Sequence, residues 1–249
     1  MSHHLVEARD VVFAYPDGQA ALNGVSFTIH HGESVAIVGG NGAGKSTLLL
    51  HLNGVLTPIR GQVCIGDIPI TRENLAEVRH TVGTIFQEAD DQLFMPTVFD
   101  DVAFGLSHQG LVAADIETRV MQALATVGAA HLRDRPPYRL SGGEKRAVAI
   151  AGVLVMQPSI LVMDEPSSGL DPAARRRLIK LLTGFDHTRI IATHDLDLVL
   201  ELCSRVLVMH RGVIEADGTP DEIFANTELL EYCQLEPPPR YLLSCENNG

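Results

Sequence analysis

Hydrophobic residues follow two patterns along the chain, and each pattern predicts a different kind of strand. Alternating apolar and polar positions at 5–13 and 25–29 predict antiparallel strands with one exposed face, joined through the turn residues Pro16-Asp17-Gly18. Largely unbroken apolar runs predict buried strands, which are expected at 34–38, 160–163, 189–193 and 205–209, with further strands at 61–65 and 82–86.

Apolar residues at helical spacing mark the middle of the chain. Ile116, Val120 and Leu124 recur at intervals of four residues, so the stretch from about 97 to 158 is expected to be a helical subdomain. Helices are also expected between buried strands, at 172–182 and 196–202. Strands that alternate with helices indicate an α/β fold with a parallel sheet and helices on both faces.

A glycine-rich segment directly follows the buried strand at 34–38, and a helical run follows the segment. Its sequence, Gly39-Gly-Asn-Gly-Ala-Gly-Lys-Ser-Thr47, has the phosphate-loop spacing. Glycines allow successive backbone N–H groups to converge on phosphate oxygens, and the helix N-terminus adds positive partial charge. Lys45 is expected to reach the β- and γ-phosphates, and the Ser46 hydroxyl to bind Mg²⁺. The alternative is a glycine-rich turn that only starts a helix.

A second candidate anion site lies in the segment Leu140–Leu154. Ser141-x-x-Glu144 has the spacing of a helix capping box, which explains the serine and the glutamate. It does not explain Gly142 and Gly143, which are poor residues for a first helical turn unless a ligand approaches the backbone closely. The sequence therefore predicts a helix N-terminus that binds an anion.

Polar residues at the ends of buried strands complete the candidate chemistry. Asp164 is placed to hold Mg²⁺, and Glu165, one residue later, to act as general base toward water. His194 ends the strand at 189–193 and is expected to contact the γ-phosphate. Gln87 follows the strand at 82–86. Tyr15 follows the first strand and offers a ring that can stack on adenine, the alternative being an aromatic residue on the rim.

Composition limits the possible partners. The 249 residues carry a formal net charge of -12, which argues against a nucleic-acid partner because backbone binding requires clustered Lys and Arg. The four cysteines show no C-x-x-C spacing, so a reducing cytoplasm is expected. The first residues lack the apolar core of a signal peptide, and the longest apolar stretch, 147–163, is too short for a membrane span. The chain is expected to be soluble by itself.

In this order, the motifs resemble those of ATP-binding-cassette (ABC) ATPase subunits. The resemblance implies a P-loop NTPase ABC ATPase core with an N-terminal antiparallel β-subdomain and an α-helical subdomain. It implies one nucleotide-binding domain at 1–235 and a Pro-rich tail at 236–249. The residues that carry it are the phosphate loop, Gln87, the signature Leu140–Glu144, the segment 160–165, Ser168–Asp171 and His194.

The resemblance also implies ATP and Mg²⁺ as cofactors and assigns a role to each matching residue. Glu165, His194, Gln87 and Lys45 are the expected catalytic residues, and Ser46, Gln87 and Asp164 are the expected Mg²⁺ ligands. The expected nucleotide contacts are Tyr15, Gly39, Asn41, Gly42, Gly44, Lys45, Ser46 and Thr47, together with Ser141, Gly142, Gly143 and Asp171 of a second subunit.

A head-to-tail dimer follows from the same resemblance, because it explains why one chain carries two anion sites about a hundred residues apart. Each nucleotide is then held between the phosphate loop of one subunit and the signature of the other. ATP binding is expected to close the dimer and hydrolysis to reopen it. Since the chain carries every catalytic element, a homodimer is expected.

Three segments, 86–94, 97–105 and 145–154, are similar to the ATPase subunits of energy-coupling-factor importers, which take up vitamins or the transition metals cobalt and nickel. Glu144 stands where Gln is frequent and Ser167 where Thr is frequent, and neither departure removes a catalytic group. The resemblance implies a peripheral ATPase at the cytoplasmic face of the cell membrane. Its expected partners are an integral membrane scaffold subunit and a membrane substrate-binding subunit.

Cobalt or nickel is the expected cargo, with a vitamin as the alternative. A soluble ABC ATPase that acts on nucleic acid or ribosomes is a further alternative, although the chain has no room for tandem cassettes or a long coiled-coil insertion. For coupling to a membrane partner, the acidic residues Glu88, Asp90 and Asp91 follow Gln87 directly. They are expected to receive a basic cytoplasmic helix, and the alternative is a solvated loop.

Overall fold

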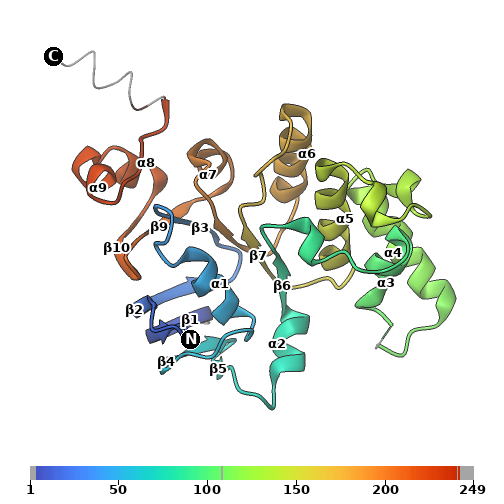
Figure 1. Cartoon of the computed structure of the whole chain (residues 1–249), viewed down its shortest axis with the longest axis horizontal. Coiled ribbons are helices and arrows are strands. Elements are labelled where there is room, and N and C mark those ends of the chain that lie inside the picture. Colours follow the sequence, from blue (N-terminus) through green and yellow to red (C-terminus); the bar gives the residue numbers. More distant parts are fainter. Residues whose placement is uncertain (1–3, 108, 240, 242–249) are drawn as a thin grey trace. The chain divides into compact units, whose positions relative to one another are not determined.

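The computed structural model describes residues 4–107, 109–239 and 241, which fall into two units (Figure 1). The first unit joins the residues up to Arg79 to those from His187 onward, and the second spans His80 to Asp186. The helical subdomain expected at 97–158 falls inside the second unit, which is longer at both ends.

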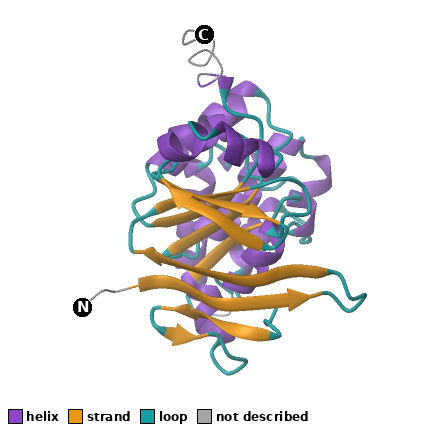
Figure 2. Cartoon of the chain, turned by 90° about the vertical axis from the view of Figure 1, so that its left-hand side faces the viewer, coloured by secondary structure: helices purple, strands orange, loops and turns teal. Residues whose placement is uncertain are grey.

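An antiparallel sheet forms the N-terminal part of the first unit, and its long strands are visible in Figure 2. Val11 pairs with Val25, and both side chains are buried, as the alternating sequence pattern predicts. The strands lie in the order β2-β1-β4-β5, with β1 at His4–Ala14, β2 at Ala20–His30, β4 at Arg60–Ile65 and β5 at Ile68–Pro69.

The first unit also contains a parallel ladder. Strand β3 (Ser34–Val38) pairs in parallel with both β8 (Thr188–Ala192) and β9 (Arg205–His210), and all five of its residues are buried. This central position explains the unbroken apolar run. Strand β10 (Val213–Gly218) pairs antiparallel with β9 and was not predicted.

Among the residues that the structure describes, four helices belong wholly to the first unit, and a fifth spans the boundary. Helix α1 begins at Lys45, directly after the glycine-rich segment, and α7 occupies the range predicted for it. The five helices are α1 (Lys45–Leu52), α2 (Leu75–Thr81), which spans the boundary, α7 (Leu196–Leu202), α8 (Pro220–Phe224) and α9 (Thr227–Tyr232).

The second unit contains the predicted helical region and a parallel strand pair, β6 (Val82–Ile85) with β7 (Ile160–Asp164). Val102, Leu124 and Val148 come from three different helices and share one buried cluster. The helices are α3 (Val98–Phe104), α4 (Ala113–Thr126), α5 (Gly142–Leu154) and α6 (Pro172–Thr183), with single 3₁₀ turns at η1 (Ala89–Asp91), η2 (Ala130–Leu132) and η3 (Pro137–Arg139).

The expected tail at 236–249 lies mostly outside the described residues. Tyr241, which is described, donates a hydrogen bond from its hydroxyl to Asp221 and places its ring near Phe224. Among the described residues, no helix is both long enough and apolar enough to span a membrane.

Candidate nucleotide-binding site

The glycine-rich segment between β3 and α1 is shaped by backbone that approaches it closely. A Cβ atom on Gly39 would lie 2.2 Å from the Met209 carbonyl oxygen. Gly44 has a φ of +103°, and a Cβ there would lie 2.5 Å from the Ala21 carbonyl oxygen. Any larger residue would therefore collide with backbone that cannot move aside, so the fold itself requires these two glycines.

The ammonium group of Lys45 is bound by carbonyl oxygens of this loop. Its Nζ donates to the carbonyl oxygens of Gly39 and Gly40 at 2.8 and 3.2 Å. The residue is 9% exposed, so its charge is concentrated inside the loop. Asn41, Gly42 and Ser46 are exposed, and they leave the loop open to a ligand. A glycine cradle, a buried lysine and a following helix fit a nucleotide phosphate group.

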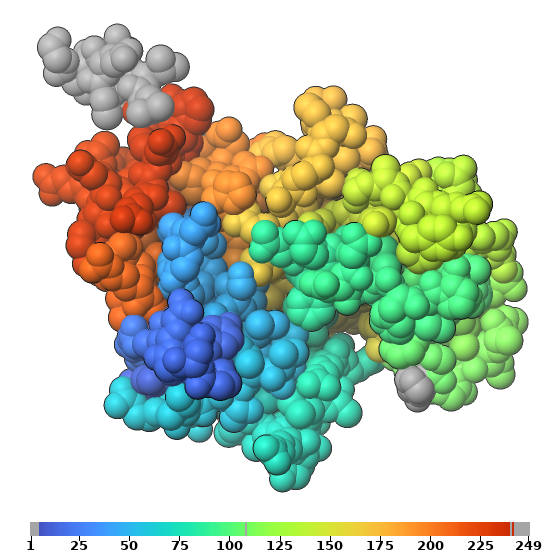
Figure 3. Space-filling view, in the orientation of Figure 1, coloured from blue at the N-terminus to red at the C-terminus, as the bar shows by residue number. Residues whose placement is uncertain are grey.

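The C-terminal part of the first unit supports the loop from outside. Gly212, in the turn between β9 and β10, donates its N–H to the Ala43 carbonyl oxygen at 3.0 Å. A Cβ on Gly40 would make ordinary contacts with the Cys233 carbonyl at 3.6 Å and with Gln234 Oε1 at 3.7 Å. The segment from β9 onward, orange to red in Figures 1 and 3, lies beside the glycine-rich loop, which is blue.

Tyr15 follows β1 and reaches the same region. Its hydroxyl lies 2.9 Å from Thr47 Oγ1, and its ring stands edge-on to Phe13. The tyrosine expected to stack on adenine is thus hydrogen-bonded to the last residue of the phosphate-loop motif. The adenine contact itself stays a prediction.

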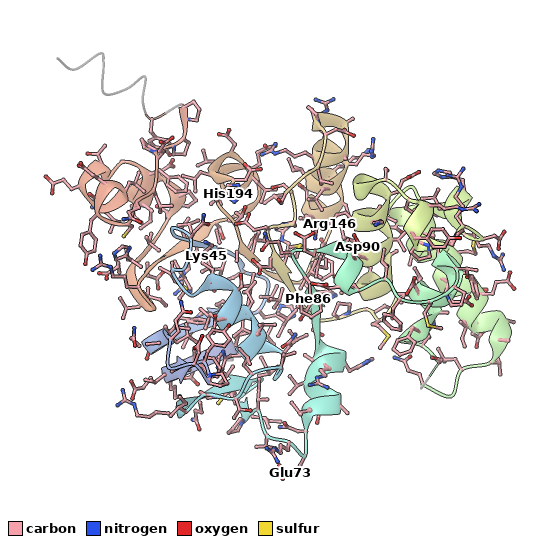
Figure 4. All side chains as sticks on the ribbon, viewed as in Figure 1. Lys45, Glu73, Phe86, Asp90, Arg146 and His194 are labelled. Atoms are coloured by element: carbon pink, nitrogen blue, oxygen red, sulfur yellow. The ribbon has the colours of Figure 1, made fainter. Side chains whose placement is uncertain are left out.

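His194 follows β8 at the end of the ladder that carries the loop. The Thr193 N–H donates to the Ile37 carbonyl oxygen at 3.2 Å, which keeps the ends of β8 and β3 side by side. His194 is exposed directly beyond that bond, and Figure 4 labels it together with Lys45. Both residues therefore occupy the carboxyl edge of the ladder, where ligands of parallel sheets bind.

In the second unit, Gln87 follows β6, and a buried arginine on α5 holds its backbone. Arg146 donates to the Phe86 carbonyl oxygen at 2.6 Å and also to the Gln87 carbonyl oxygen. Its side chain is buried, which lowers the pKa of its guanidinium, while the charges of Glu88 and Asp164 oppose that shift. Figure 4 shows Arg146, Phe86 and Asp90 close together.

Asp164 ends strand β7, the parallel neighbour of β6, and Glu165 follows directly. Asp164 is half-buried and Glu165 is 8% exposed. Glu165 has a φ of +45°, in the left-handed region that a glutamate rarely adopts. Backbone strain of this kind costs about 1–3 kcal/mol and concentrates at functional sites. Because β6 and β7 are parallel, Gln87 and Asp164 lie at the same edge of the sheet.

Ser141 is the N-cap of α5, and the predicted capping box is present. The Glu144 carboxylate accepts from the Ser141 N–H at 2.8 Å, and these contacts lower the pKa of Glu144. A Cβ atom added to Gly142 would have no neighbour within 4 Å, and one added to Gly143 would lie 3.7 Å from the nearest atom. Local packing therefore requires neither glycine, and the anion site expected here stays a prediction.

Asp171 has a local role that the sequence analysis did not assign. It is the N-cap of α6, and its Oδ1 accepts from the N–H groups of Ala173 and Ala174, both at 2.8 Å. These bonds lower the pKa of the exposed carboxyl. The expected contact across a dimer stays a prediction.

The predicted site residues thus form two groups, one in each unit. The first unit holds the phosphate loop, Tyr15 and His194. The second unit holds Gln87, Ser141, Gly142, Gly143, Asp164, Glu165 and Asp171. Ser46 in the first unit, and Gln87 and Asp164 in the second, carry oxygen donors of the kind that Mg²⁺ prefers, and their joint binding of the ion stays a prediction.

The sequence analysis missed the basic pair that follows the signature. Lys145 Nζ lies 2.6 Å from Asp90 Oδ1, and Arg146 holds Gln87 as described above. The acidic cluster of Glu88, Asp90 and Asp91 is therefore partly neutralised by the chain itself. Two consecutive basic residues after a helix cap were the available signal, although their partners lie more than 50 residues away.

A glycine cradle around a buried lysine at the start of a helix defines a P-loop nucleotide-binding protein, and comparison with known proteins narrows the class. Residues 22–168 match the family model described as ABC transporter. Over 238 residues the chain is 63% identical to a protein of Geobacter sulfurreducens named as an ABC transporter ATP-binding protein, with 96% of each covered. It is 48% identical over 240 residues to the energy-coupling factor transporter ATP-binding protein EcfA of Methanocaldococcus jannaschii, covering 94% of this chain and 86% of that protein.

Solved structures agree with this result. CbiO1 of Clostridium perfringens, described as part of the ABC transporter complex CbiONQ, matches with a TM-score of 0.81 and 40% identity over 97% of this chain and 99% of that one. The dimeric ATP-binding cassette MJ0796, bound to ADP and Pi, matches with a TM-score of 0.79 and 26% identity over 86% and 98%. The chain belongs to the ABC transporter family and is an ATPase subunit of the energy-coupling-factor type. The predicted fold class is confirmed.

Proposed function

We propose that this chain is the ATP-hydrolysing subunit of an energy-coupling-factor importer and drives uptake of cobalt or nickel ions. The glycine cradle around Lys45, in a chain 48% identical to an energy-coupling factor ATP-binding protein, is the observation that carries the proposal. The likeness to CbiO1, a part of the complex CbiONQ, supports a membrane-bound assembly. The chain then works at the cytoplasmic face of the membrane.

In the proposed mechanism, the phosphate-loop N–H groups and Lys45 bind the β- and γ-phosphates of ATP. Ser46, Asp164 and Gln87 would hold Mg²⁺, which supplies positive charge to the phosphates. Glu165 accepts a proton from the attacking water, and His194 contacts the γ-phosphate. The left-handed backbone of Glu165 is strained, and because such strain concentrates at functional sites, it supports the general-base role.

Two copies of the chain would form the working unit. Ser141, Gly142 and Gly143 of one copy contact the γ-phosphate bound by its partner copy, and Asp171 crosses the same interface. The free space at Gly142, where an added Cβ would have no neighbour within 4 Å, supports a ligand approaching the backbone there. The dimeric neighbour MJ0796 supports this arrangement, since it is an ATP-binding cassette solved as a dimer.

A surface on the second unit suits the membrane scaffold subunit. Phe94 and Phe104 are 63% and 43% exposed, and their rings stack edge to face at a centroid distance of 5.0 Å. Glu88 and Asp91 are exposed nearby along the chain, after Gln87. An apolar anchor beside negative charge fits a cytoplasmic helix with apolar and basic residues.

Copurification from membranes tests the proposal. A tagged copy is expressed from its own chromosomal neighbourhood, extracted in mild detergent, and its partners are identified by mass spectrometry. We expect a polytopic scaffold subunit and a small hydrophobic substrate-binding subunit. The variant Phe94→Ala/Phe104→Ala is expected to lose both partners, while the variant Tyr138→Ala, whose side chain is 76% exposed, keeps them. Recovery of nucleic acid or ribosomal proteins alone would contradict importer function.

Uptake assays with the recovered complex identify the cargo. Radioactive cobalt or nickel should accumulate in proteoliposomes that contain ATP, and the Glu165→Gln complex should give no uptake. Transport of a vitamin but of neither metal would exclude metal import and leave the importer class intact.

A further inference from the structure

Four residues around the start of α1 form a closed ring of contacts. The Tyr15 hydroxyl lies 2.9 Å from Thr47 Oγ1, and His51 Nδ1 lies 2.7 Å from the Thr47 carbonyl oxygen. Phe13 packs edge to face against both rings, at centroid distances of 5.1 Å to Tyr15 and 4.8 Å to His51. Thr47, the last residue of the phosphate-loop motif, is therefore held at its side chain and at its backbone.

The hydrogen bond to the carbonyl oxygen fixes the protonation of His51. A carbonyl oxygen only accepts, so Nδ1 carries the proton. The ring is 1% exposed, and burial lowers the pKa of His51, which keeps the ring neutral. Among the described residues, Nε2 has no hydrogen-bond partner. His51 thus anchors Thr47 and carries no charge toward a ligand.

The direction of the bond between Tyr15 and Thr47 follows from the chemistry of the two hydroxyls. A phenol, with a pKa of about 10, is a stronger donor than an aliphatic alcohol. When Tyr15 donates, Thr47 Oγ1 is the acceptor and its own proton is free for a second acceptor. The two hydroxyls then polarise one another, which strengthens the outer donor.

We propose that Tyr15 is a positioning residue for phosphate, in addition to its expected contact with adenine. Its hydroxyl donates to Thr47 and directs the Thr47 proton toward a phosphate oxygen in the loop. The ring and the hydroxyl of Tyr15 thus have separate tasks, one for the base and one for the phosphate chain. This inference rests on the proposed nucleotide site at Gly39–Thr47.

Inorganic tripolyphosphate separates the two tasks because it has the phosphates of ATP and no base. The full-length Tyr15→Phe protein keeps the ring and loses the hydroxyl. Competition against a fluorescent ATP analogue, with Mg²⁺ present, measures both affinities. We expect Tyr15→Phe to weaken tripolyphosphate and ATP by the same factor, about five-fold, the usual effect of one net hydrogen bond. Tyr15→Ala should weaken ATP further than tripolyphosphate.

Thr47 variants test whether the effect passes through its hydroxyl. In a Thr47→Val background, Tyr15→Phe should change tripolyphosphate affinity no further, whereas in a Thr47→Ser background the loss should return. Tyr232→Phe is the matched control, since it removes an exposed phenol from the same unit and should leave both affinities unchanged. A loss of affinity caused only by reduced stability would persist in the Thr47→Val background, so the double variant separates that cause from the proposed hydrogen bond.

The outcomes distinguish the inference from the site on which it rests. If wild-type protein does not bind tripolyphosphate, or if Lys45→Ala binds it equally well, the nucleotide site is wrongly placed. If wild-type protein binds it and Lys45→Ala does not, but Tyr15→Phe binds it as tightly as wild type, the site stands and the role of the Tyr15 hydroxyl is refuted.

Discussion

At the scale of single residues, Glu165 combines a buried carboxyl with a left-handed backbone. Since general-base catalysis typically contributes about 100- to 10,000-fold, we expect Glu165→Gln to lower the ATP hydrolysis rate by a factor in that range. Its affinity for ATP should stay within a few-fold of wild type, because the amide has the same shape. Phosphate release and equilibrium binding measure the two quantities.

Lys45→Ala should lower the affinity for ATP, which Glu165→Gln should leave nearly unchanged. It removes the ammonium that fills the loop, so ATP binding itself should weaken, by about 10- to 100-fold for the loss of charge-assisted hydrogen bonds. Rapid hydrolysis by Glu165→Gln would disprove the general-base role, whatever the result for Lys45→Ala.

Among the helices, α5 has a supporting role, because its residue Arg146 binds the segment that follows strand β6. Replacing Arg146 with Met keeps the apolar stem and removes the donors to Phe86 and Gln87, so two carbonyl groups lose their partner. We expect the free energy of unfolding to fall by about 2–4 kcal/mol. The rate of hydrolysis should fall more than the affinity for ATP, because Lys45 is untouched.

Urea unfolding and steady-state kinetics measure these two effects. Arg146→Lys is the informative companion, because lysine lacks the planar fork of donors that Arg146 presents to the two carbonyls and should restore only part of the loss. Hydrolysis at the wild-type rate by Arg146→Met would show that α5 does not position Gln87.

A capping box on α8 predicts a dependence of stability on pH. The Thr219 N–H and hydroxyl bind the Glu222 carboxylate and lower its pKa from 4.5. A lowered folded pKa means that stability from Glu222 is fully present above pH 4.5 and is lost as the pH falls through the folded value.

The Glu222→Gln variant should therefore be less stable than wild type at pH 6, and the difference should shrink as the pH falls below 4.5. Urea midpoints measured between about pH 3 and pH 6 test this. Glu231→Gln on α9 matches the change of charge and should not reproduce the trend.

The elements themselves were mostly readable from the sequence. Strand β3 and helix α7 lie at their predicted ranges. The unbroken apolar run of β3 is typical of a buried strand, and the capped run of α7 is typical of a helix. Strand β10 was missed because none of its six residues is fully buried, so its sequence lacks a clear apolar alternation. The short helices α8 and α9 are too brief for periodicity to identify.

Within the candidate site, the sequence predicted the motifs that lie in one short segment, but not the contacts between residues far apart along the chain. The phosphate loop and the capping box at Ser141 were predicted because each is one short continuous segment. The bond between Tyr15 and Thr47 spans 32 residues, and that between Arg146 and Gln87 spans 59. Contacts at such separations depend on the packing of strands and helices, which no single-sequence pattern encodes.

For the whole molecule, the central prediction is nucleotide-dependent dimerisation. With ATP and Mg²⁺, the Glu165→Gln protein should shift from monomer to dimer. ATP then holds the two subunits together, and the dimer does not reopen because ATP is not hydrolysed. Size-exclusion chromatography with light scattering measures the mass directly. Lys45→Ala should stay monomeric under the same conditions, and adding EDTA should return Glu165→Gln to monomer. A monomeric Glu165→Gln protein at saturating ATP would contradict the head-to-tail arrangement.

The walls of the phosphate loop come from the far end of the chain. Strand β3 pairs with β8 and β9, and the loop rests on Met209 and on the Gly212 N–H. During translation, the glycine motif leaves the ribosome long before these partners are made. A nascent chain therefore carries the motif without its supports, and ATP can assist folding only after residues beyond Gly212 have emerged.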